Sequence, residues 1–377
     1  MTTSKHRVHG LSGDEVAPHN PPLDHGEVQA LLAGFSALRG PARALWHSPR
    51  PFSAAARVRT AAGDIFVKRH PARVRTPRAL LEEHAFIAHL RDAGLPVPLV
   101  LADDEGETAI QRGAAVYEVH APATGLDLYR DAPSWTPLLQ LGRARSAGAM
   151  LARLHRGAMG FTAPSRSAAL LVARDDVLRA PDFLDAIEAR CALRPALARY
   201  FAQRDWRREA AALAARHRDL QPRLASLPRL WTHGDWHASN LFWSGTGDDA
   251  TVASILDFGL CAPTFALYDL ATAIERNAVA WMQLDQGARA VFPETARALV
   301  AGYAGVLPLD DAQRALLAEV LPLVHVDFAL SEMDYFLDVL HSSEQADIGW
   351  NDFLLGHAAW FDTAPAHALL DAIRTSG

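Results

Sequence analysis

The chain has 377 residues, of which 50% are hydrophobic and 21% are charged, a composition typical of a globular protein with a large core. Its formal net charge of -6 argues against nucleic acid as a partner, because binding to a phosphate backbone usually needs a basic surface. No segment approaches the roughly 20 consecutive apolar residues of a membrane helix, so no membrane partner is expected.

Residues 1–25 are expected to form a flexible N-terminal arm, because they are rich in proline, lack periodicity and contain few apolar residues. A segment clamped onto the domain surface is the alternative. The chain begins without the apolar run of a secretory signal. Cys191 and Cys261 stand far apart, which fits neither a disulfide framework nor a zinc site. We therefore expect a reducing, cytoplasmic location.

A small β-rich N-lobe is expected over residues 26–120. Its helices have apolar residues at spacings of three and four, and the second helix ends at Gly94-Leu95-Pro96. Its strands are short and bounded by turn residues. The expected elements are a helix at about 26–38, three strands within 42–70, a helix from about 80 to 93, and strands at about 97–102 and 114–120.

Residues 121–377 are expected to form a larger helical C-lobe, because long segments rich in Ala and Leu dominate this part of the chain. The region 231–259 interrupts them with strand-like and turn-like sequence. The predicted fold class is therefore α+β with two lobes. The helices are expected at about 138–156, 183–217, 295–303 and 311–341.

The most informative motif is His233-Gly-Asp-Trp-His-Ala-Ser-Asn240, followed after a strand by Asp257-Phe-Gly259. On one loop, Asp235 can direct a carboxylate at a substrate hydroxyl while Asn240 offers an amide oxygen to a metal. Asp257 adds a second acid. Magnesium prefers such oxygen ligands. Phosphoryl transfer needs a positioned metal, a positioned hydroxyl and neutralised phosphate charge, so the motif points to this chemistry.

The pattern His-Gly-Asp-x-His-x-x-Asn with the later Asp-Phe-Gly resembles the aminoglycoside phosphotransferase and choline kinase family, from about Leu38 onward. The resemblance implies a protein-kinase-like fold that binds ATP and Mg²⁺. It implies that Asp235 is the catalytic base and that Asn240 and Asp257 are the magnesium ligands. In such folds the first histidine of the motif braces the loop. The role of His237 stays open.

Lys68 ends an apolar strand, where a kinase-like fold holds the lysine that contacts the α- and β-phosphates. The alternative is a solvent-exposed charge at the edge of a strand, with no role in binding. The following segment, Leu81-Glu-Glu-His-Ala-Phe86, resembles the bacterial stress-response kinases of the same group. Glu83 shares a helix face with buried apolar positions and is preferred over Glu82 as the partner of Lys68.

Two further nucleotide contacts are expected from the resemblance. The loop 48–55, which includes Ser53, stands where a kinase has a glycine-rich loop over the phosphates, although it contains no glycine. The adenine is expected to contact backbone groups of the connector between the lobes, near residues 118–121. Val119 is the contact expected there.

The acceptor is expected to be a small molecule, because the segment after Gly259 leads at once into a helix and leaves no room for the activation segment of a protein kinase. On the expected helix 324–341, Asp327, Asp334 and Asp338 fall within one arc. This acidic stripe has two interpretations. It is either a solvated face or a wall of the acceptor cleft that holds a cationic amine.

The sequence thus predicts an ATP-dependent phosphotransferase that moves the γ-phosphate to a hydroxyl of a small cationic acceptor, such as an aminoglycoside, choline or a homoserine-like metabolite. One alternative is a protein Ser/Thr kinase of the stress-response type. The other is a non-catalytic nucleotide-binding regulator, against which the presence of Lys68, Asp235, Asn240 and Asp257 argues. The oligomeric state is left open.

Overall fold

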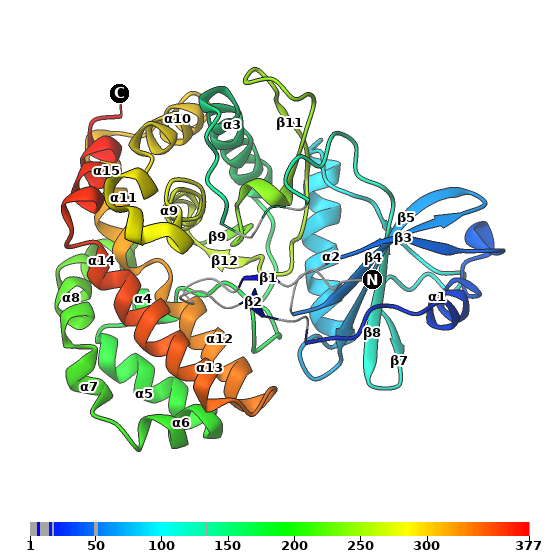
Figure 1. The fold of residues 1–377 in the computed structure, drawn as a ribbon, viewed down its shortest axis with the longest axis horizontal. Helices are drawn as coiled ribbons and strands as arrows, with labels where there is room; N and C mark the ends of the chain where they lie inside the picture. Colours follow the sequence, from blue (N-terminus) through cyan, green and yellow to red (C-terminus); the bar gives the residue numbers. More distant parts are fainter. Residues whose placement is uncertain are drawn as a thin grey trace.

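The computed structural model describes residues 6–7, 15–16, 19–48, 52–130, 132 and 135–376. Figure 1 shows a small lobe built on an antiparallel sheet beside a larger lobe of helices. The sheet ends at His120, and the next long helix, α3, begins at Leu141. The two-lobed α+β architecture expected from the sequence is therefore present.

The sheet of the small lobe has the strand order β3-β4-β5-β8-β6, and β7 pairs with β8 outside this path. Strand β7 was not expected from the sequence. Every pair in the sheet is antiparallel. The strands are β3 (Arg43–His47), β4 (Ala54–Thr60), β5 (Gly63–Pro71), β6 (Val100–Leu101), β7 (Ile110–Arg112) and β8 (Ala115–His120).

The register between β5 and β8 decides which side chains share a face. Lys68 lies opposite Glu118, and Val67 lies opposite Val119. Since side chains alternate along a strand, Lys68 and Glu118 point to one face of the sheet and the two valines to the other. Both valines are fully buried in an apolar cluster with the helix α1 (His25–Leu32).

Helix α2 (Pro77–Asp92) covers the other face of the sheet and joins the two lobes (Figure 1). Thr76 caps its start by accepting a hydrogen bond from the backbone of Ala79. Phe86 of α2 packs into the large core of the helical lobe, with its ring centroid 5.3 Å from that of Trp231 and 6.0 Å from that of Phe258.

Several helices of the larger lobe are shorter than the sequence predicted. The expected helix 183–217 is divided before Pro195, where Arg194 adopts φ -131° and ψ 84°, because a residue before proline avoids the helical conformation. The expected helix 311–341 is divided around Pro322. The elements of this lobe outside the site are α3 (Leu141–Ala158), α4 (Asp176–Arg179), α5 (Phe183–Leu193), α6 (Pro195–Phe201), α7 (Trp206–Glu209), α8 (Ala211–Ser226), η3 (Trp281–Ala290), α10 (Pro293–Ala304), α11 (Asp311–Val320), η4 (Leu321–Leu323), α12 (Val326–Asp338), α13 (Ser343–Ile348), η5 (Gly349–Gly356), α14 (His357–Trp360) and α15 (Ala364–Arg374).

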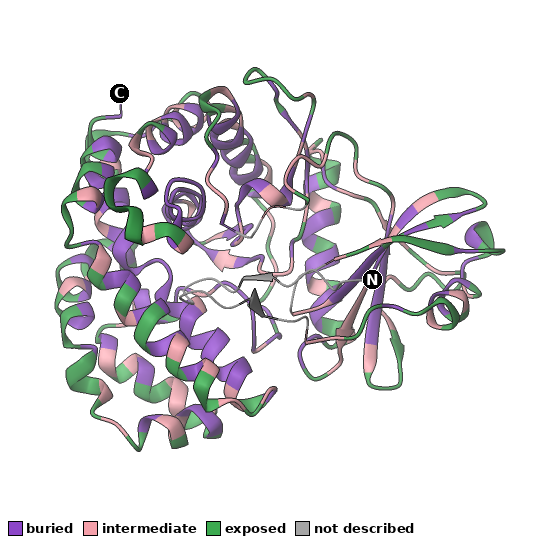
Figure 2. Cartoon of the chain, viewed as in Figure 1, coloured by how far each residue is buried: buried purple, intermediate pink, exposed green. Residues whose placement is uncertain are grey.

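Helix α9 (Ala266–Asn277) runs through the middle of the larger lobe. Every residue from Leu267 to Asn277 is buried, and Figure 2 shows the helix buried all round. The polar members of such a helix must find partners inside the protein, because burying an unpaired polar group is costly. Three of them, Asp269, Arg276 and Asn277, find partners in the candidate active site.

The expected N-terminal arm lies partly outside the described residues. Within it, β1 (His6–Arg7) pairs with β2 (Glu15–Val16). His19 stacks on Tyr335 of α12 at a centroid distance of 5.8 Å, so this part of the arm contacts the larger lobe.

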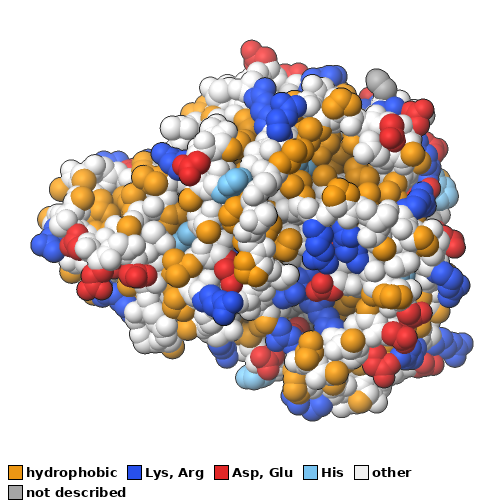
Figure 3. All heavy atoms as spheres, turned by 180° about the vertical axis from the view of Figure 1, so that it is seen from behind, with side chains coloured by type: hydrophobic (Ala, Val, Ile, Leu, Met, Phe, Trp, Pro, Cys, Tyr) orange, Lys and Arg blue, Asp and Glu red, His pale blue; other side chains and the backbone are white. Residues whose placement is uncertain are grey.

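On the face seen in Figure 3, acidic side chains lie among the basic ones on both lobes. Within the described ranges, no helix combines the length and the apolar character needed to cross a membrane.

Candidate active site

Two short strand pairs bring the two motifs together. β9 (Leu230–Thr232) leads into the loop with Asp235, which continues through η2 (Ala238–Asn240) into β10 (Leu241–Trp243). β11 (Val252–Ile255) pairs with β10 and delivers Asp257 next to this loop. β12 (Ala262–Thr264) then pairs back onto β9. The backbone of Leu256 ties the motifs, because its N–H donates to the carbonyl of Asn240 at 2.8 Å.

Asp235 and Asn240 are in direct contact. The amide nitrogen of Asn240 donates to the carboxylate of Asp235 at 3.0 Å and to its backbone carbonyl at 2.9 Å. These contacts use the amide nitrogen and leave the amide oxygen for a cation. The Nε2 atom of His237 lies 3.5 Å from the same carboxylate oxygen.

Asp257 meets Lys68 from the other lobe, with 3.1 Å between the carboxylate and the ammonium. Asp257 has a left-handed backbone with φ 57°, a strained conformation that proteins often keep at functional sites. Its side chain stays 44% exposed. Burial alone would raise the pKa of Asp257, but the Lys68 ammonium outweighs it and holds that pKa below its usual range.

The donor set fits a magnesium ion. The amide oxygen of Asn240 and the carboxylate of Asp257 are hard oxygen ligands, and the described contacts leave both able to coordinate. Magnesium is usually bound by one or two such groups together with substrate phosphates and water.

Glu83 does not form the expected ion pair with Lys68. It is buried, as its helix face predicts, but its carboxylate lies 3.5 Å from the guanidinium of Arg166. Lys68 is held instead by Asp257. Burial alone would lower the pKa of Lys68, and the charges of Asp257, Glu118 and Glu83, in that order, raise it. The physical reason is the buried Arg166, which competes for Glu83.

The loop that carries Asp235 is braced by His233 and Gly234. His233 is fully buried, and its Nε2 atom contacts the carbonyl of Leu256 at 2.9 Å. Burial lowers the pKa of His233, so the ring is neutral. Gly234 has φ 77°, and a Cβ atom there would lie 2.7 Å from Ala173 and 2.8 Å from the carbonyl oxygen of Leu260. Only glycine fits this turn.

Helix α9 holds the same loop at both ends. At its start, the carboxylate of Asp269 accepts from the backbone N–H groups of His233 and Gly234, each at 2.8 Å. At its end, the side chain of Asn277 donates to the carbonyl of Trp236 at 2.9 Å and accepts from the N–H of Ala238 at 3.0 Å. Asp269 therefore caps the loop that carries Asp235 and not its own helix.

Arg276 is a site residue that sequence reasoning missed. Its guanidinium contacts the Asp235 carboxylate and lies 4.0 Å from the centroid of the Trp135 ring. Burial lowers the pKa of Arg276 to about 9, against the pull of Glu332, so the group stays charged at neutral pH. A signal was present in the sequence, since Asp269 and Arg276 lie seven residues apart, a spacing that puts both on one face of a helix.

The two other expected nucleotide contacts have different surroundings. Ser53 is half-buried and lies directly before β4, whereas residues 49–51 of the same loop lie outside the described residues. The side chain of Val119 is fully buried on the face away from Lys68, and its backbone lies between β5 and β6, opposite Val67 and Leu101.

The acidic stripe of α12 points away from Asp235. For Asp327 and Asp334, neither the solvated face nor the wall of the acceptor cleft is correct. Asp327 is fully buried and lies 3.3 Å from Arg190, while Asp334 is buried 3.1 Å from Arg194. Only Asp338 is exposed. Burial raises the pKa of Asp327 to about 7 in spite of Arg190. α12 packs on α4 and α6, and the arginines that pair with the stripe come from α5 and from the junction between α5 and α6.

Comparison with known sequences identifies the family. A model of the phosphotransferase enzyme family (APH) matches residues 50–317. A homoserine kinase of Gluconacetobacter diazotrophicus is 27% identical over 267 residues, which cover 69% of this chain and 71% of that enzyme. Homoserine kinases of Gluconobacter oxydans and Phenylobacterium zucineum are 30% and 32% identical over 30% and 53% of this chain, and the matches span only 32% and 52% of those enzymes.

Solved structures share the fold. A microcompartment-associated aminopropanol kinase has a TM-score of 0.62 at 17% identity, covering 91% of this chain and 99% of its own. The amicoumacin kinase hAmiN, solved in complex with AMP-PNP, Ca²⁺ and Ami, has a TM-score of 0.59 at 16% identity, covering 89% and 92%. These likenesses confirm the kinase-like fold. With a family model that matches more than half of its residues, the chain belongs to the phosphotransferase enzyme family and is a phosphotransferase.

Proposed function

We propose that this protein transfers the γ-phosphate of ATP to the hydroxyl of a small amino acid of the homoserine type, with Mg²⁺ as the metal. The observation that carries the proposal is two side-chain pairs, Asp235 with Asn240 and Asp257 with Lys68 of the other lobe, on motifs that the backbone hydrogen bond from Leu256 to Asn240 holds together. This set supplies a base, oxygen ligands and a cation for the phosphates, which are the requirements of phosphoryl transfer.

Each residue has a proposed role. Asp235 accepts the proton of the acceptor hydroxyl and orients it. Asn240 and Asp257 would hold Mg²⁺, which when bound neutralises the charge of the nucleotide phosphates. When Asp257 coordinates the metal, its partner Lys68 is free to contact those phosphates. Ser53 and the backbone of Val119 remain proposed nucleotide contacts.

The charge beside Asp235 favours an acceptor with a carboxylate. The Arg276 guanidinium lies on the catalytic carboxylate, so an acceptor that is only cationic, such as choline, meets a like charge there. An acceptor carboxylate can pair with Arg276 and release Asp235 for the hydroxyl. Three similar relatives are named homoserine kinases, and homoserine carries both groups. Because arginines pair with Asp327 and Asp334, these carboxylates do not support an acidic wall that binds an amine.

The protein-kinase alternative finds no support in this geometry. After Gly259 the chain forms only β12 before α9 begins at Ala266, so no activation segment separates them. A regulator without catalysis would need no base at Asp235.

A panel of acceptors tests the proposal. Purified protein with ATP and Mg²⁺ is given L-homoserine, 3-aminopropanol, choline or kanamycin, and ADP release is followed together with the mass of the phosphorylated product. We expect homoserine to give the highest kcat/KM. Turnover of choline or kanamycin in preference to homoserine would overturn the choice of acceptor.

A further inference from the structure

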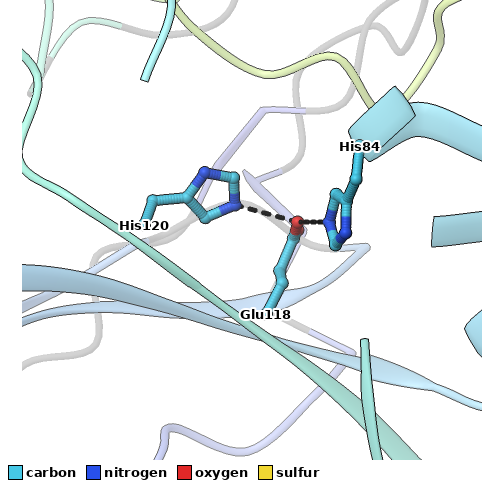
Figure 4. A group of neighbouring side chains, drawn as sticks. All are labelled: His84, Glu118 and His120. Atoms are coloured by element: carbon cyan, nitrogen blue, oxygen red, sulfur yellow. Dashed lines mark hydrogen bonds and ion pairs between the residues drawn. The ribbon is translucent and has the colours of Figure 1, made fainter. Parts of the chain in front are cut away.

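A second group of ligand-type side chains lies inside the N-lobe, on the sheet face that carries Lys68. Figure 4 shows the rings of His84 and His120 pointing at one carboxylate oxygen of Glu118. The Nε2 atoms of the two rings lie 2.9 and 2.8 Å from that oxygen. All three residues are buried, and their ligand atoms lie within 4.8 Å of one another.

The register of the sheet builds this cluster. Glu118 and His120 stand two residues apart on β8 and therefore share a face, while His84 reaches them from α2 above that face. The other carboxylate oxygen of Glu118 is held by the Nε2 atom of His70 on β5, at 3.0 Å. The side chains thus come from three elements of fixed relative position.

Outer partners hold His84 and Glu118 in place. The second ring nitrogen of His84, Nδ1, lies 2.8 Å from the hydroxyl of Thr108. In metal sites, ligating histidines almost always pair their other nitrogen in this way, and ligating carboxylates are hydrogen-bonded in turn, as Glu118 is by His70. Both features are built into the fold.

We propose that His84, Glu118 and His120 form a binding site for a late first-row divalent cation of the Zn²⁺ class. Two imidazoles and one carboxylate are a donor set that suits zinc and not magnesium, which prefers oxygen alone. In the loaded site each imidazole would bind through an unprotonated Nε2 and carry its one ring proton on Nδ1, so a neutral ring changes tautomer and loses no proton. This site is separate from the proposed magnesium ligands Asn240 and Asp257.

The site connects α2 to the sheet. His84 directly follows Glu83, and Glu118 lies opposite Lys68 in the strand pair. A cation held by both elements fixes the helix against β8, which pairs with the strand β5 that carries Lys68. Without a cation, the same atoms satisfy one another when each neutral imidazole donates its Nε2 proton to Glu118. The competing outcome is therefore that these side chains form a hydrogen-bonded network and bind no cation.

The first test uses the full chain without a histidine tag, because a tag binds zinc itself. Protein dialysed against EDTA is reloaded with ZnCl₂, the bound zinc is counted by mass spectrometry, and zinc-edge X-ray absorption reports the ligands. We expect one zinc per chain with imidazole nitrogens at about 2.0–2.1 Å. Substoichiometric zinc, or a shell of oxygens alone, would overturn the proposal without any variant.

The second test locates the ion. His84→Gln and His120→Gln should each weaken zinc binding at least about 10-fold. His89→Gln is the matched control, because His89 lies on the same helix but contacts the carbonyl of Gly157 instead. Equal zinc affinity in the wild type and all three variants contradicts the assignment. Neither test uses phosphotransfer, so both are independent of the proposed acceptor.

Discussion

The guanidinium of Arg276 contacts the carboxylate of Asp235, so the proposed catalytic base already carries a counter-charge supplied by α9. The guanidinium also lies over the face of Trp135, which restricts its movement. Two groups therefore compete for Asp235, namely Arg276 and the incoming acceptor hydroxyl. How this competition is resolved should decide which acceptors are used.

Arg276→Gln should remove the enzyme's preference for acceptors that carry a carboxylate. A hydrogen bond to a charged group contributes about 1.5–3 kcal/mol, or roughly 10- to 100-fold. We expect the wild type to prefer L-homoserine over 3-aminopropanol, which lacks the carboxylate, and the variant to lose this preference. Steady-state kcat/KM for both compounds checks it, with nucleotide KM as the internal control. An unchanged ratio would show that Arg276 acts only on Asp235.

Asp235→Asn should lower kcat strongly while nucleotide binding persists. General-base catalysis is typically worth about 10²- to 10⁴-fold, and the amide cannot accept the proton. The measurement pairs ADP release with nucleotide titration by calorimetry. If the variant keeps wild-type turnover with the same nucleotide affinity, Asp235 is not the base.

Asp257→Ala should weaken nucleotide binding only when magnesium is present. The wild type gains affinity from an ion shared by protein and phosphates, and the variant lacks one of its ligands. Titrations with Mg²⁺ and with EDTA compare the two proteins. Removal of Asp257 also releases Lys68, so affinity in EDTA should be unchanged or slightly higher. Equal magnesium dependence in both proteins rules out Asp257 as a ligand.

Asp269→Ala should destabilise the protein. The substitution leaves the buried N–H groups of His233 and Gly234 without their acceptor, and each such group costs about 1–3 kcal/mol. Urea denaturation should therefore show a loss of at least about 2 kcal/mol. Asp371→Ala is the control, because its ion pair with Arg374 is exposed and should contribute less than about 1 kcal/mol. Similar midpoints for both variants would contradict the bracing role.

The pH dependence of stability should reveal the raised pKa of Glu332. Burial raises the pKa of Glu332 from 4.5 to about 8, although Arg276 opposes the shift. The folded state thus prefers the protonated acid, so ionisation in the unfolded chain reduces stability as the pH rises from about 4.5 to about 8. Glu332→Gln removes this loss. Relative to the wild type, the variant should gain stability between pH 5 and pH 9, measured by urea denaturation; a constant difference would contradict the shift.

The sequence by itself determined the local chemistry and the order of the elements. The spacing of Asp235, Asn240 and Asp257 can be read directly, because one loop and one hairpin hold all three. The periodicity of α2 likewise placed Glu83 on its buried face. Such features depend on neighbours in the chain, so local propensity and pattern are enough to predict them.

Tertiary structure decided which charges meet. Lys68 and Asp257 stand 189 residues apart, and Arg166 reaches Glu83 from the other lobe. A helical pattern showed that the acidic residues of α12 share a face, but not that arginines cover it. The same holds for Arg276 on Asp235. Helical and strand periods fix which side chains point the same way, whereas their partners depend on how distant elements pack.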